Sequence, residues 1–497
     1  MHPAPRTTGS GRARRQVCYN PDFAIKSTFF MPLGACRLRK RVLMLVGLCM
    51  GLNVVSCGGG SSKSTRSGLP HRVLASQGVT ASFSFGGLVL INGANDTLPA
   101  IAHLVGGNSP GIMAISPTRN IVATFDSSTD TVFAVDTTLE TSIGSGVRLP
   151  ASSSSIVVPT ASQTGFAAVP GATVNGFAFL GAVEVLNFAT SSFTTIAVNN
   201  AQTVVSNSTG TQLLVFSPDS DLVTVLYPAA AIPPVDTSCL TAGLTPPTPV
   251  APGSPCAIVT APSFSRPVNA IINGNTAYIL SCGTQCGGSA FNGSNSLTCG
   301  SNPAAVAQAC ISVFDLGSLT VTQSIPVDAA TMALLNGSTL YVAGTSPTNN
   351  DCAGQTTTAT VCGRLDVVNL PSATVTATAA ITNGYHDRMD LTTNGQVFIG
   401  SHDCTNIGNV NIPGSGEVRG CLSIYKTGDG SVLIPSDNGD VTGLQGFTTR
   451  DVEYVAQGGQ LRVYDTTRDI LLINDFVPQG TIDIVGHVGD VKAIDFF

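Results

Sequence analysis

Short segments in which apolar and polar residues alternate recur along the whole chain, and most of them end on an Asp or an Asn. The clearest is Gln460 to Thr466, with the sequence QLRVYDT. Alternation with a period of two is typical of a half-buried β-strand. A short acidic or amide side chain at the end of a strand can bond the backbone of a following turn. We therefore expect each segment to be a strand that runs into a tight turn.

Eight versions of this segment occur, and six of them end in Asp or Asn. They are Gly87 to Asn92, Thr131 to Asp136, Ala182 to Asn187, Leu222 to Tyr227, Cys310 to Asp315, Arg364 to Asn369, Cys421 to Lys426 and Gln460 to Asp465. A second strand precedes most copies and is reached through a Gly-containing hairpin turn. The turns with Gly274, Gly337 and Gly395 are the clearest, and a further strand follows each copy. The repeat is thus a four-stranded antiparallel meander of about forty residues, which predicts the blade of a β-propeller.

The two ends of the repeat array predict how the ring closes. The first unit begins at Arg72 and lacks a first strand, whereas strand-like sequence is left over after the last unit, at Ile482 to Val485 and Val491 to Phe497. A C-terminal strand that completes the first blade would remove the open edges of a linear array. The sequence therefore predicts an all-β chain with eight blades, closed by its N- and C-terminal strands. Seven blades remain the alternative if the divergent copy at Leu222 belongs to an insertion.

Composition agrees with β structure and argues against one class of partner. Only 10% of the residues are charged, whereas Gly and Pro number 53 and 29, which favours strands and turns over exposed helices. The formal net charge is −6, and no basic cluster follows Arg41. We therefore expect no nucleic-acid partner.

The N-terminal region predicts where in the cell the protein is located. A basic run that ends at Arg41 precedes a short apolar stretch, residues 42–55, and then Ser56 and Cys57. This arrangement resembles the signal and lipobox of bacterial lipoproteins. The resemblance implies a signal peptide at residues 31–56, lipid on Cys57 and, because Gly58 follows, export to the outer membrane. A plain secretory signal with a coincidental Cys is the alternative.

The flanking segments complete the domain plan. Residues 1–30 precede Met31 and are interpreted as an extension from an early start codon. Residues 57–70 are rich in Gly and Ser and suit a flexible tether. The propeller is expected over residues 71–497.

The repeats resemble those of the YVTN-type and lactonase-like β-propeller proteins. The likeness is carried by three short motifs, Leu340 to Val342, Val313 to Asp315 and Val463 to Asp465, and it extends over residues 71–497. Repeats of the WD type are disfavoured because the chain has no Trp. The resemblance implies a propeller whose central channel holds ligands or metals.

Ten cysteines lie after Cys57, all between residues 239 and 421. An even number of cysteines in an exported chain favours disulfides over free thiols. From their positions at strand ends and in loops we expect five pairs, Cys282 with Cys310, Cys286 with Cys299, Cys352 with Cys362, Cys404 with Cys421 and Cys239 with Cys256. Zinc at the C-x3-C spacing of Cys282 and Cys286 is the alternative. Three of the stapled loops would join second and third strands, so they would share one face that suits recognition.

Polar clusters are few, and the richest lies in and after the segment HDRMD. If this segment is the innermost strand of its blade, its side chains reach the central channel. The candidate ligand or metal residues are His386, Asp387, Arg388, His402 and Asp403. The alternative is structural, with Asp387 and Arg388 as an ion pair between blades and His402 and Asp403 as turn residues.

Two function classes follow from these observations. The first is a lipid-anchored binding or interaction module of the cell envelope, at the periplasmic face or the cell surface. It would be monomeric, need no cofactor and bind a protein or carbohydrate. The second is a lactonase-like hydrolase or lyase that holds a divalent metal at the channel mouth. Such a site needs converging acidic and His ligands from several blades, and only one blade offers a cluster. The binding class is therefore favoured.

Overall fold

The computed structural model divides the chain into two units, Met1–Lys63 and Ser64–Phe497. It describes residues 66–79, 86–100, 102–160, 162–174, 180–231, 233–241, 253–291, 297–299, 307–346, 363–404, 420–435, 439–473 and 487–495, all in the second unit. The expected signal peptide and Cys57 lie outside these residues, as does most of the tether. In the described part of the chain, no helix is both long and apolar enough to cross a membrane.

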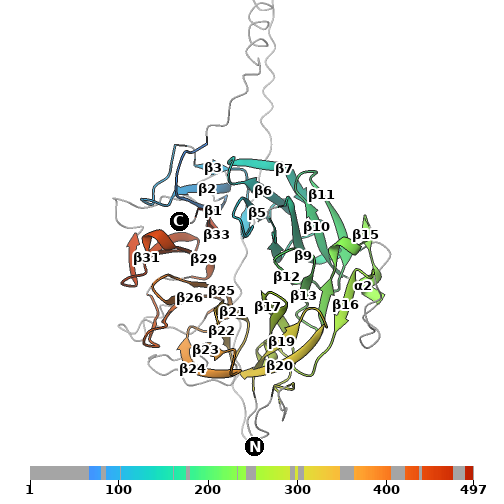
Figure 1. Ribbon diagram of the computed structural model, residues 1–497. Helices are drawn as coiled ribbons and strands as arrows, with labels where there is room; N and C mark the ends of the chain where they lie inside the picture. The colour runs from blue at the N-terminus through green and yellow to red at the C-terminus, as the bar shows by residue number, and fades with distance from the viewer. Residues whose placement is uncertain are drawn as a thin grey trace, which may run out of the picture. The chain divides into compact units, whose positions relative to one another are not determined.

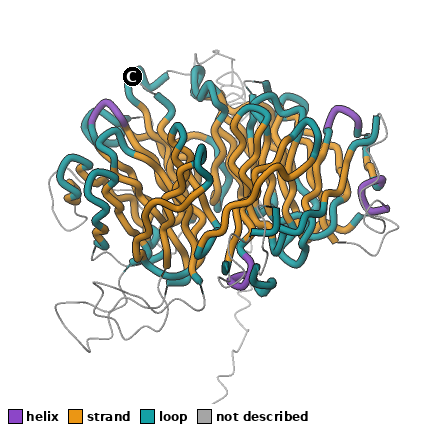
Figure 2. Tube along the Cα trace, turned by 60° about the horizontal axis from the view of Figure 1, so that its bottom comes forward, coloured by secondary structure: helices purple, strands orange, loops and turns teal. Residues whose placement is uncertain are grey.

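The second unit is an eight-bladed β-propeller, and almost every regular element in it is a strand (Figures 1 and 2). We number the blades in chain order. In the first four blades the strands, from the innermost outward, are as follows. Blade 1 consists of β33 (His487–Ala493), β1 (Arg72–Gly78), β2 (Gly87–Asn92) and β3 (His103–Leu104); blade 2 of β4 (Pro110–Ile115), β5 (Ile121–Asp126), β6 (Thr131–Asp136) and β7 (Thr141–Arg148); blade 3 of β8 (Ser155–Val157), β9 (Thr164–Thr173), β10 (Leu180–Asn187) and β11 (Ser192–Ala197); blade 4 of β12 (Thr203–Ser206), β13 (Leu213–Phe216), β14 (Val223–Leu226) and β16 (Cys256–Val259).

The other four blades repeat the same order without interruption. Blade 5 consists of β17 (Pro267–Asn273), β18 (Thr276–Ser281), β19 (Ala309–Asp315) and β20 (Thr320–Val327); blade 6 of β21 (Met332–Asn336), β22 (Thr339–Thr345), β23 (Gly363–Asn369) and β24 (Thr374–Ile381); blade 7 of β25 (Tyr385–Leu391), β26 (Gln396–His402), β27 (Leu422–Lys426) and β28 (Val432–Leu433); blade 8 of β29 (Val441–Phe447), β30 (Val452–Gln457), β31 (Gln460–Asp465) and β32 (Ile470–Ile473).

Few elements depart from this plan. Blade 3 has a fifth strand, β15 (Val235–Asp236), which pairs parallel with β11. Within the described residues, the helical pieces are α2 (Ser238–Thr241) and the 3₁₀ turns Pro228–Ala230, Gly283–Cys286 and Thr448–Arg450. Loops that connect the strands therefore carry the local variation.

The recurring segment is the third strand of every blade, and its terminal residue works as expected. In all six copies that end in Asp or Asn, the side-chain Oδ1 accepts a backbone N–H two or three residues ahead. Asp136, for example, accepts from Thr138 and Leu139 at 2.8 and 2.9 Å. These bonds close the turn into the fourth strand, so the repeated Asp is needed for the fold.

Closure of the ring is confirmed. Strand β1 lies between β2 and β33, with Val73 opposite Ala493 in the register, so the C-terminal strand supplies the missing strand of the first blade. Arg72 adds an ion pair to Asp495 at 2.8 Å. The divergent copy at Leu222 contributes β14, the third strand of its own blade, which decides for eight blades over seven. The surplus segment Ile482 to Val485 lies outside the described residues.

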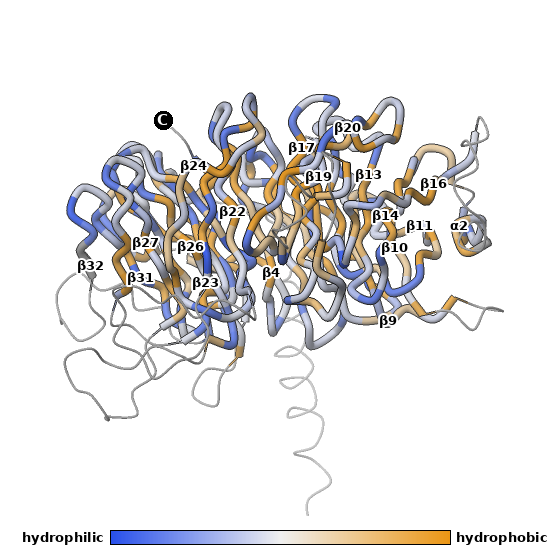
Figure 3. Tube along the Cα trace, turned by 90° about the horizontal axis from the view of Figure 1, so that it is seen from below, coloured by the Kyte–Doolittle hydropathy of each residue, from blue (hydrophilic) through white to orange (hydrophobic). Residues whose placement is uncertain are grey.

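Apolar side chains fill the space between neighbouring blades. One cluster joins Val73 and Val491 of blade 1 to Phe447 and Tyr454 of blade 8. Figure 3 shows the hydrophobic residues along strands such as β19 and β22. Burial at about 25 cal/mol per Å² of apolar surface makes these interfaces the main source of stability. The rigid ring then fixes the positions of the inner strands.

Four disulfides lie within the described residues, and two of them match the expected pairs, Cys239–Cys256 and Cys404–Cys421. The other two expected pairs are wrong. Cys282 bonds Cys286, and Cys299 bonds Cys310. The expected pair Cys352 and Cys362 lies outside the described residues.

Local geometry explains the difference. The 3₁₀ turn Gly283–Cys286 folds the chain back, which brings the Cα atoms of Cys282 and Cys286 to 5.8 Å. Cys299 and Cys310 are buried together beside Phe291. Thiols joined in this way cannot also hold the zinc ion that the C-x3-C spacing allowed.

Candidate functional site

The segment HDRMD lies on β25, which is the innermost strand of blade 7, as its sequence predicts. Inner strands of successive blades pack against one another around the axis, and β25 contacts β21 and β29 (Figure 1). The pairing of β25 with β26 skips Asp387, because His386 lies opposite Ser401 and Arg388 opposite Gly400. A bulge of this kind re-aims a side chain, and here it affects Asp387 at the channel.

His386 is a structural residue. Its side chain is fully buried, and Nε2 lies 2.9 Å from the carbonyl oxygen of Thr382. Burial lowers the pKa of the imidazole to about 4, so the ring is neutral at physiological pH. A Cβ on Gly363 would lie 3.0 Å from the ring, so a small residue there makes room for it. The ring therefore packs between two strands and does not line the channel.

Asp387 and Arg388 form an ion pair within one strand. Nη1 of Arg388 lies 3.0 Å from Oδ2 of Asp387 and also donates to the Asp387 carbonyl at 2.9 Å. Nε of Arg388 donates to the carbonyl of Thr442 on β29 at 2.8 Å, which ties blade 7 to blade 8. Oδ1 of Asp387 is enclosed and has no hydrogen-bond donor. Burial therefore raises the pKa of this carboxyl, while Arg388 opposes the shift.

His402 and Asp403 lie at the end of β26, where the chain turns. Nδ1 of His402 lies 3.0 Å from Oδ2 of Asp403, and the His402 ring lies 5.3 Å from that of Tyr385. Asp403 has a φ of 56°, and its side chain is 86% exposed. These contacts favour the role of turn residues that the sequence left open.

The five predicted residues do not converge on one point. Asp387 and Arg388 face the channel, His386 is packed away from it, and His402 and Asp403 lie in a turn. Across the described ranges, no three His, Cys, Asp or Glu side chains are placed to hold a metal ion together.

The channel contains a cavity of about 310 Å³ on the axis of the ring. Six of the eight inner strands or the loops beside them line it, namely β4, β8, β21, β25, β29 and β33. The lining residues are Ile112, Met113, Ser154, Ser155, Ile156, Met332, Asp387, Arg388, Met389, Leu444, Asp490 and Lys492. The cavity is thus built only once the ring has closed.

Asp490 and Lys492 are functional candidates that the sequence reasoning missed. Nζ of Lys492 lies 2.9 Å from Oδ1 of Asp490, and Oδ2 of Asp490 accepts the backbone N–H of Met113 at 2.8 Å. The two residues are spaced by two on a strand, so they share a face. Their alternation with Val491 was the available signal, and it indicated the channel once β33 was recognised as an inner strand.

Two more acids interact with Lys492, and one of them is fully buried. Glu453 is fully buried on β30, and burial together with the charge of Asp390 raises its pKa well above the usual range. Asp390 accepts the backbone N–H of Gly446 at 2.5 Å, and burial also raises its pKa. Lys492 opposes both shifts. The Lys492 ammonium group thus interacts with carboxyl groups from three blades, since Asp390 belongs to blade 7, Glu453 to blade 8 and Asp490 to blade 1.

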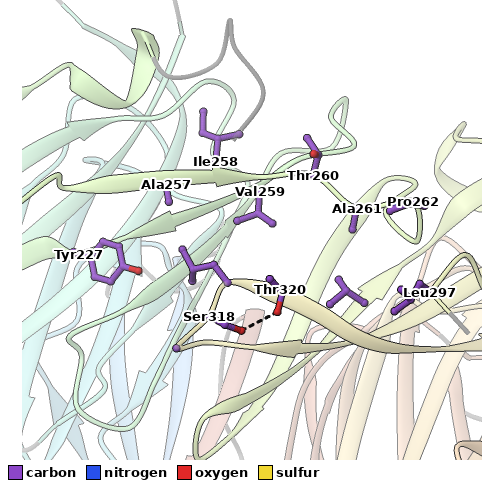
Figure 4. A pocket seen from close by; sticks show the side chains of 13 residues that line it. Tyr227, Ala257, Ile258, Val259, Thr260, Ala261, Pro262, Leu297, Ser318 and Thr320 are labelled. Carbon is purple, nitrogen blue, oxygen red and sulfur yellow. Dashed lines mark hydrogen bonds between the residues drawn. The ribbon is translucent and has the colours of Figure 1, made fainter. Parts of the chain in front are cut away.

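A larger pocket, of about 650 Å³, lies away from the channel between the outer strands of blades 4 and 5. Figure 4 shows Ile258 and Val259 on one side of it and Ser318 and Thr320 on the other. Its walls are mostly apolar, and no lining residue is charged. A few convergent polar groups are what orient a ligand in a pocket, so the channel cavity is the stronger candidate despite its smaller volume.

Comparison with known proteins supports the fold alone. No protein-family model and no curated protein matches the chain. A solved structure described as dihydro-heme d1 dehydrogenase NirN in complex with DHE is 12% identical, with a TM-score of 0.51 over 86% of this chain and 75% of that one. Kuenenia stuttgartiensis hydrazine synthase is 12% identical, with a TM-score of 0.39 over 72% of this chain and 77% of that one. Only the first of these likenesses, with its TM-score above 0.5, bears on the fold, and it agrees with a β-propeller.

Proposed function

We propose that this chain is a binding protein of the bacterial cell envelope, and that its propeller takes a small ligand into the axial cavity. The observation that carries the proposal is the cavity itself, about 310 Å³ and lined by charged side chains from separate blades. Ligand pockets start at about 300 Å³ and combine apolar walls with a few polar groups. The cavity fits both conditions, at the small end of the range, and suits a small ligand.

The envelope location rests on the N-terminal sequence. The basic run, the short apolar stretch and Cys57 support export and a lipid anchor on the outer membrane. The anchor is tested with Cys57→Ser in the full-length protein. The proposal expects the variant to leave the membrane fraction for the soluble fraction, and equal membrane binding of both proteins would contradict it.

Ligand binding is tested by thermal unfolding of the full-length protein in detergent. Amino acids, monosaccharides, nucleosides and dicarboxylates are added one at a time at millimolar concentration. A ligand that binds only the folded state raises Tm, and we expect at least one compound to do so. The variant Met332→Trp, which fills the cavity, should remove the increase. Leu139→Trp, on an exposed turn, should keep it.

Two results would contradict the proposal. If no compound raises Tm, or if Met332→Trp responds as the wild type does, the axial cavity is not the binding site. The Tm of each variant without ligand shows whether the substitution has disturbed the fold itself.

A further inference from the structure

The hydrogen-bond donors of the axial cavity are only partly used by the protein. A guanidinium group has five N–H bonds, and Arg388 uses three of them, for Thr442, the Asp387 carbonyl and the Asp387 carboxylate. Among the described residues, the two N–H bonds of its Nη2 have no partner. A Lys ammonium has three N–H bonds, and Lys492 uses one of them, for Asp490. The cavity therefore offers donors from two cations.

The acceptor side of the cavity is incomplete in the same way. Asp387 receives a side-chain donor only at Oδ2, and its enclosed Oδ1 has none. Asp490 differs, because its two oxygens receive Lys492 and the backbone N–H groups of Met113 and Val491. An enclosed carboxylate without enough donors is costly. The Asp387 side chain as a whole is 31% exposed, so a cationic donor in the cavity would lower the cost of burying this carboxylate.

The charges of the lining residues cancel. Two carboxylates, Asp387 and Asp490, are matched by two cations, Arg388 and Lys492. A ligand with several negative charges would face both carboxylates, and a polycation would face both cations. The ligand that fits carries one charge of each sign.

Most of the remaining cavity wall is apolar. This part consists of three methionines with Ile112, Ile156 and Leu444, while Ser154 and Ser155 add polar lining, and none of the lining residues is aromatic. Methionine adapts its shape to apolar groups of different outline. This wall suits an aliphatic substituent next to the charged end of the ligand.

We propose that the cavity binds a free α-amino acid with an aliphatic side chain. The carboxylate accepts from Nη2 of Arg388 and from Lys492, the ammonium donates to Asp387, and the side chain lies on the methionine-rich wall. The inference rests on the proposed function, since it names the ligand class of the same cavity. In this binding mode, Arg388 recognises the ligand carboxylate and Asp387 recognises the ligand ammonium.

The experiment is isothermal titration of the full-length protein in detergent with three matched probes. These are L-leucine, 4-methylpentanoate, which lacks the amino group, and 3-methylbutylamine, which lacks the carboxylate. A hydrogen bond between charged groups contributes enough for about a tenfold change in affinity. We expect L-leucine to bind, and each analogue to bind at least about tenfold more weakly.

Two variants test which residue binds the ligand carboxylate and which binds the ligand ammonium. Arg388→Gln should weaken L-leucine and 4-methylpentanoate by about tenfold and leave 3-methylbutylamine unchanged. Asp387→Asn should weaken L-leucine and 3-methylbutylamine and leave 4-methylpentanoate unchanged. Arg148→Gln, an exposed position on the outer strand β7, is the matched control and should bind as the wild type does. Lys492→Gln serves as a second test of the carboxylate site if Arg388→Gln does not fold.

The results that overturn the inference are distinct from those that overturn the proposed function. Equal affinity for the three probes, or an Arg388→Gln variant that loses the amine as strongly as the amino acid, contradicts zwitterion recognition. Absence of L-leucine binding alongside cavity-dependent stabilisation by a sugar or nucleoside rejects the amino acid and keeps the binding function. Absence of any cavity-dependent ligand rejects both.

Discussion

At the scale of single residues, one position of the repeated strand has a structural role that its sequence does not reveal. In blades 5, 6 and 7, the residue three places before the terminal Asp, Asn or Lys binds the linker that enters its own blade. Oγ of Ser312 lies 2.7 Å from Oγ of Ser263, Oδ2 of Asp366 accepts the backbone N–H of Asp328 at 2.8 Å, and Oγ of Ser423 accepts that of Thr382 at 3.0 Å. The side chain at this position thus helps to fix where the inner strands of these three blades start.

Asp366 predicts a dependence of stability on pH. Burial, then the charge of Asp328, raises its pKa from 3.8 to about 7. The folded state therefore binds a proton more tightly than the unfolded state does, and stability is lost as pH rises from about 4 to about 7. Asp366→Asn keeps an acceptor for Asp328 and cannot ionise. As pH rises over this range, the free energy of unfolding of the variant should increase relative to that of the wild type.

The measurement is denaturant unfolding of both proteins at several pH values. Asp403→Asn makes the same substitution at a carboxyl that is 86% exposed, and it is measured as the matched control. A constant difference between wild type and Asp366→Asn would contradict the raised pKa of Asp366.

At the scale of elements, the sequence predicts strands well and loop connections less well. Period-two alternation and the recurring Asp mark the third strand of every blade, and the residual C-terminal strand marks the closure at Arg72. Disulfide partners are harder to predict from the sequence, because Cys282 has two possible partners. Cys286 is near in the chain, and Cys310 is near across the strands. A 3₁₀ turn decides between them, and alternation carries no signal for such a turn.

Peptide mapping without reduction tests this assignment. Digestion should release one peptide that contains Cys282 and Cys286 linked to each other, and a second link between Cys299 and Cys310. Cys404–Cys421 is the internal reference because sequence and structure agree on it. A fragment that joins Cys282 to Cys310 would restore the pairing expected from strand ends.

At the scale of the whole molecule, the candidate site belongs to the ring and not to any one repeat. Asp387 and Arg388 could be placed in the channel from the sequence because they lie on a first strand. Asp490 and Lys492 could not be joined to them, since about a hundred residues separate the two pairs along the chain and only ring closure brings their strands to one cavity. The five predicted residues do not converge for a related reason: the bulge at Asp387 and the burial of His386 send neighbouring side chains in different directions.

The most direct test of the central claim is a crystal structure of the full-length protein grown with L-leucine. The account predicts ligand density in the axial cavity, with the carboxylate within hydrogen-bond distance of Nη2 of Arg388 and the ammonium beside Asp387. Density confined to the apolar pocket between blades 4 and 5, with the axial cavity free of ligand, would contradict it.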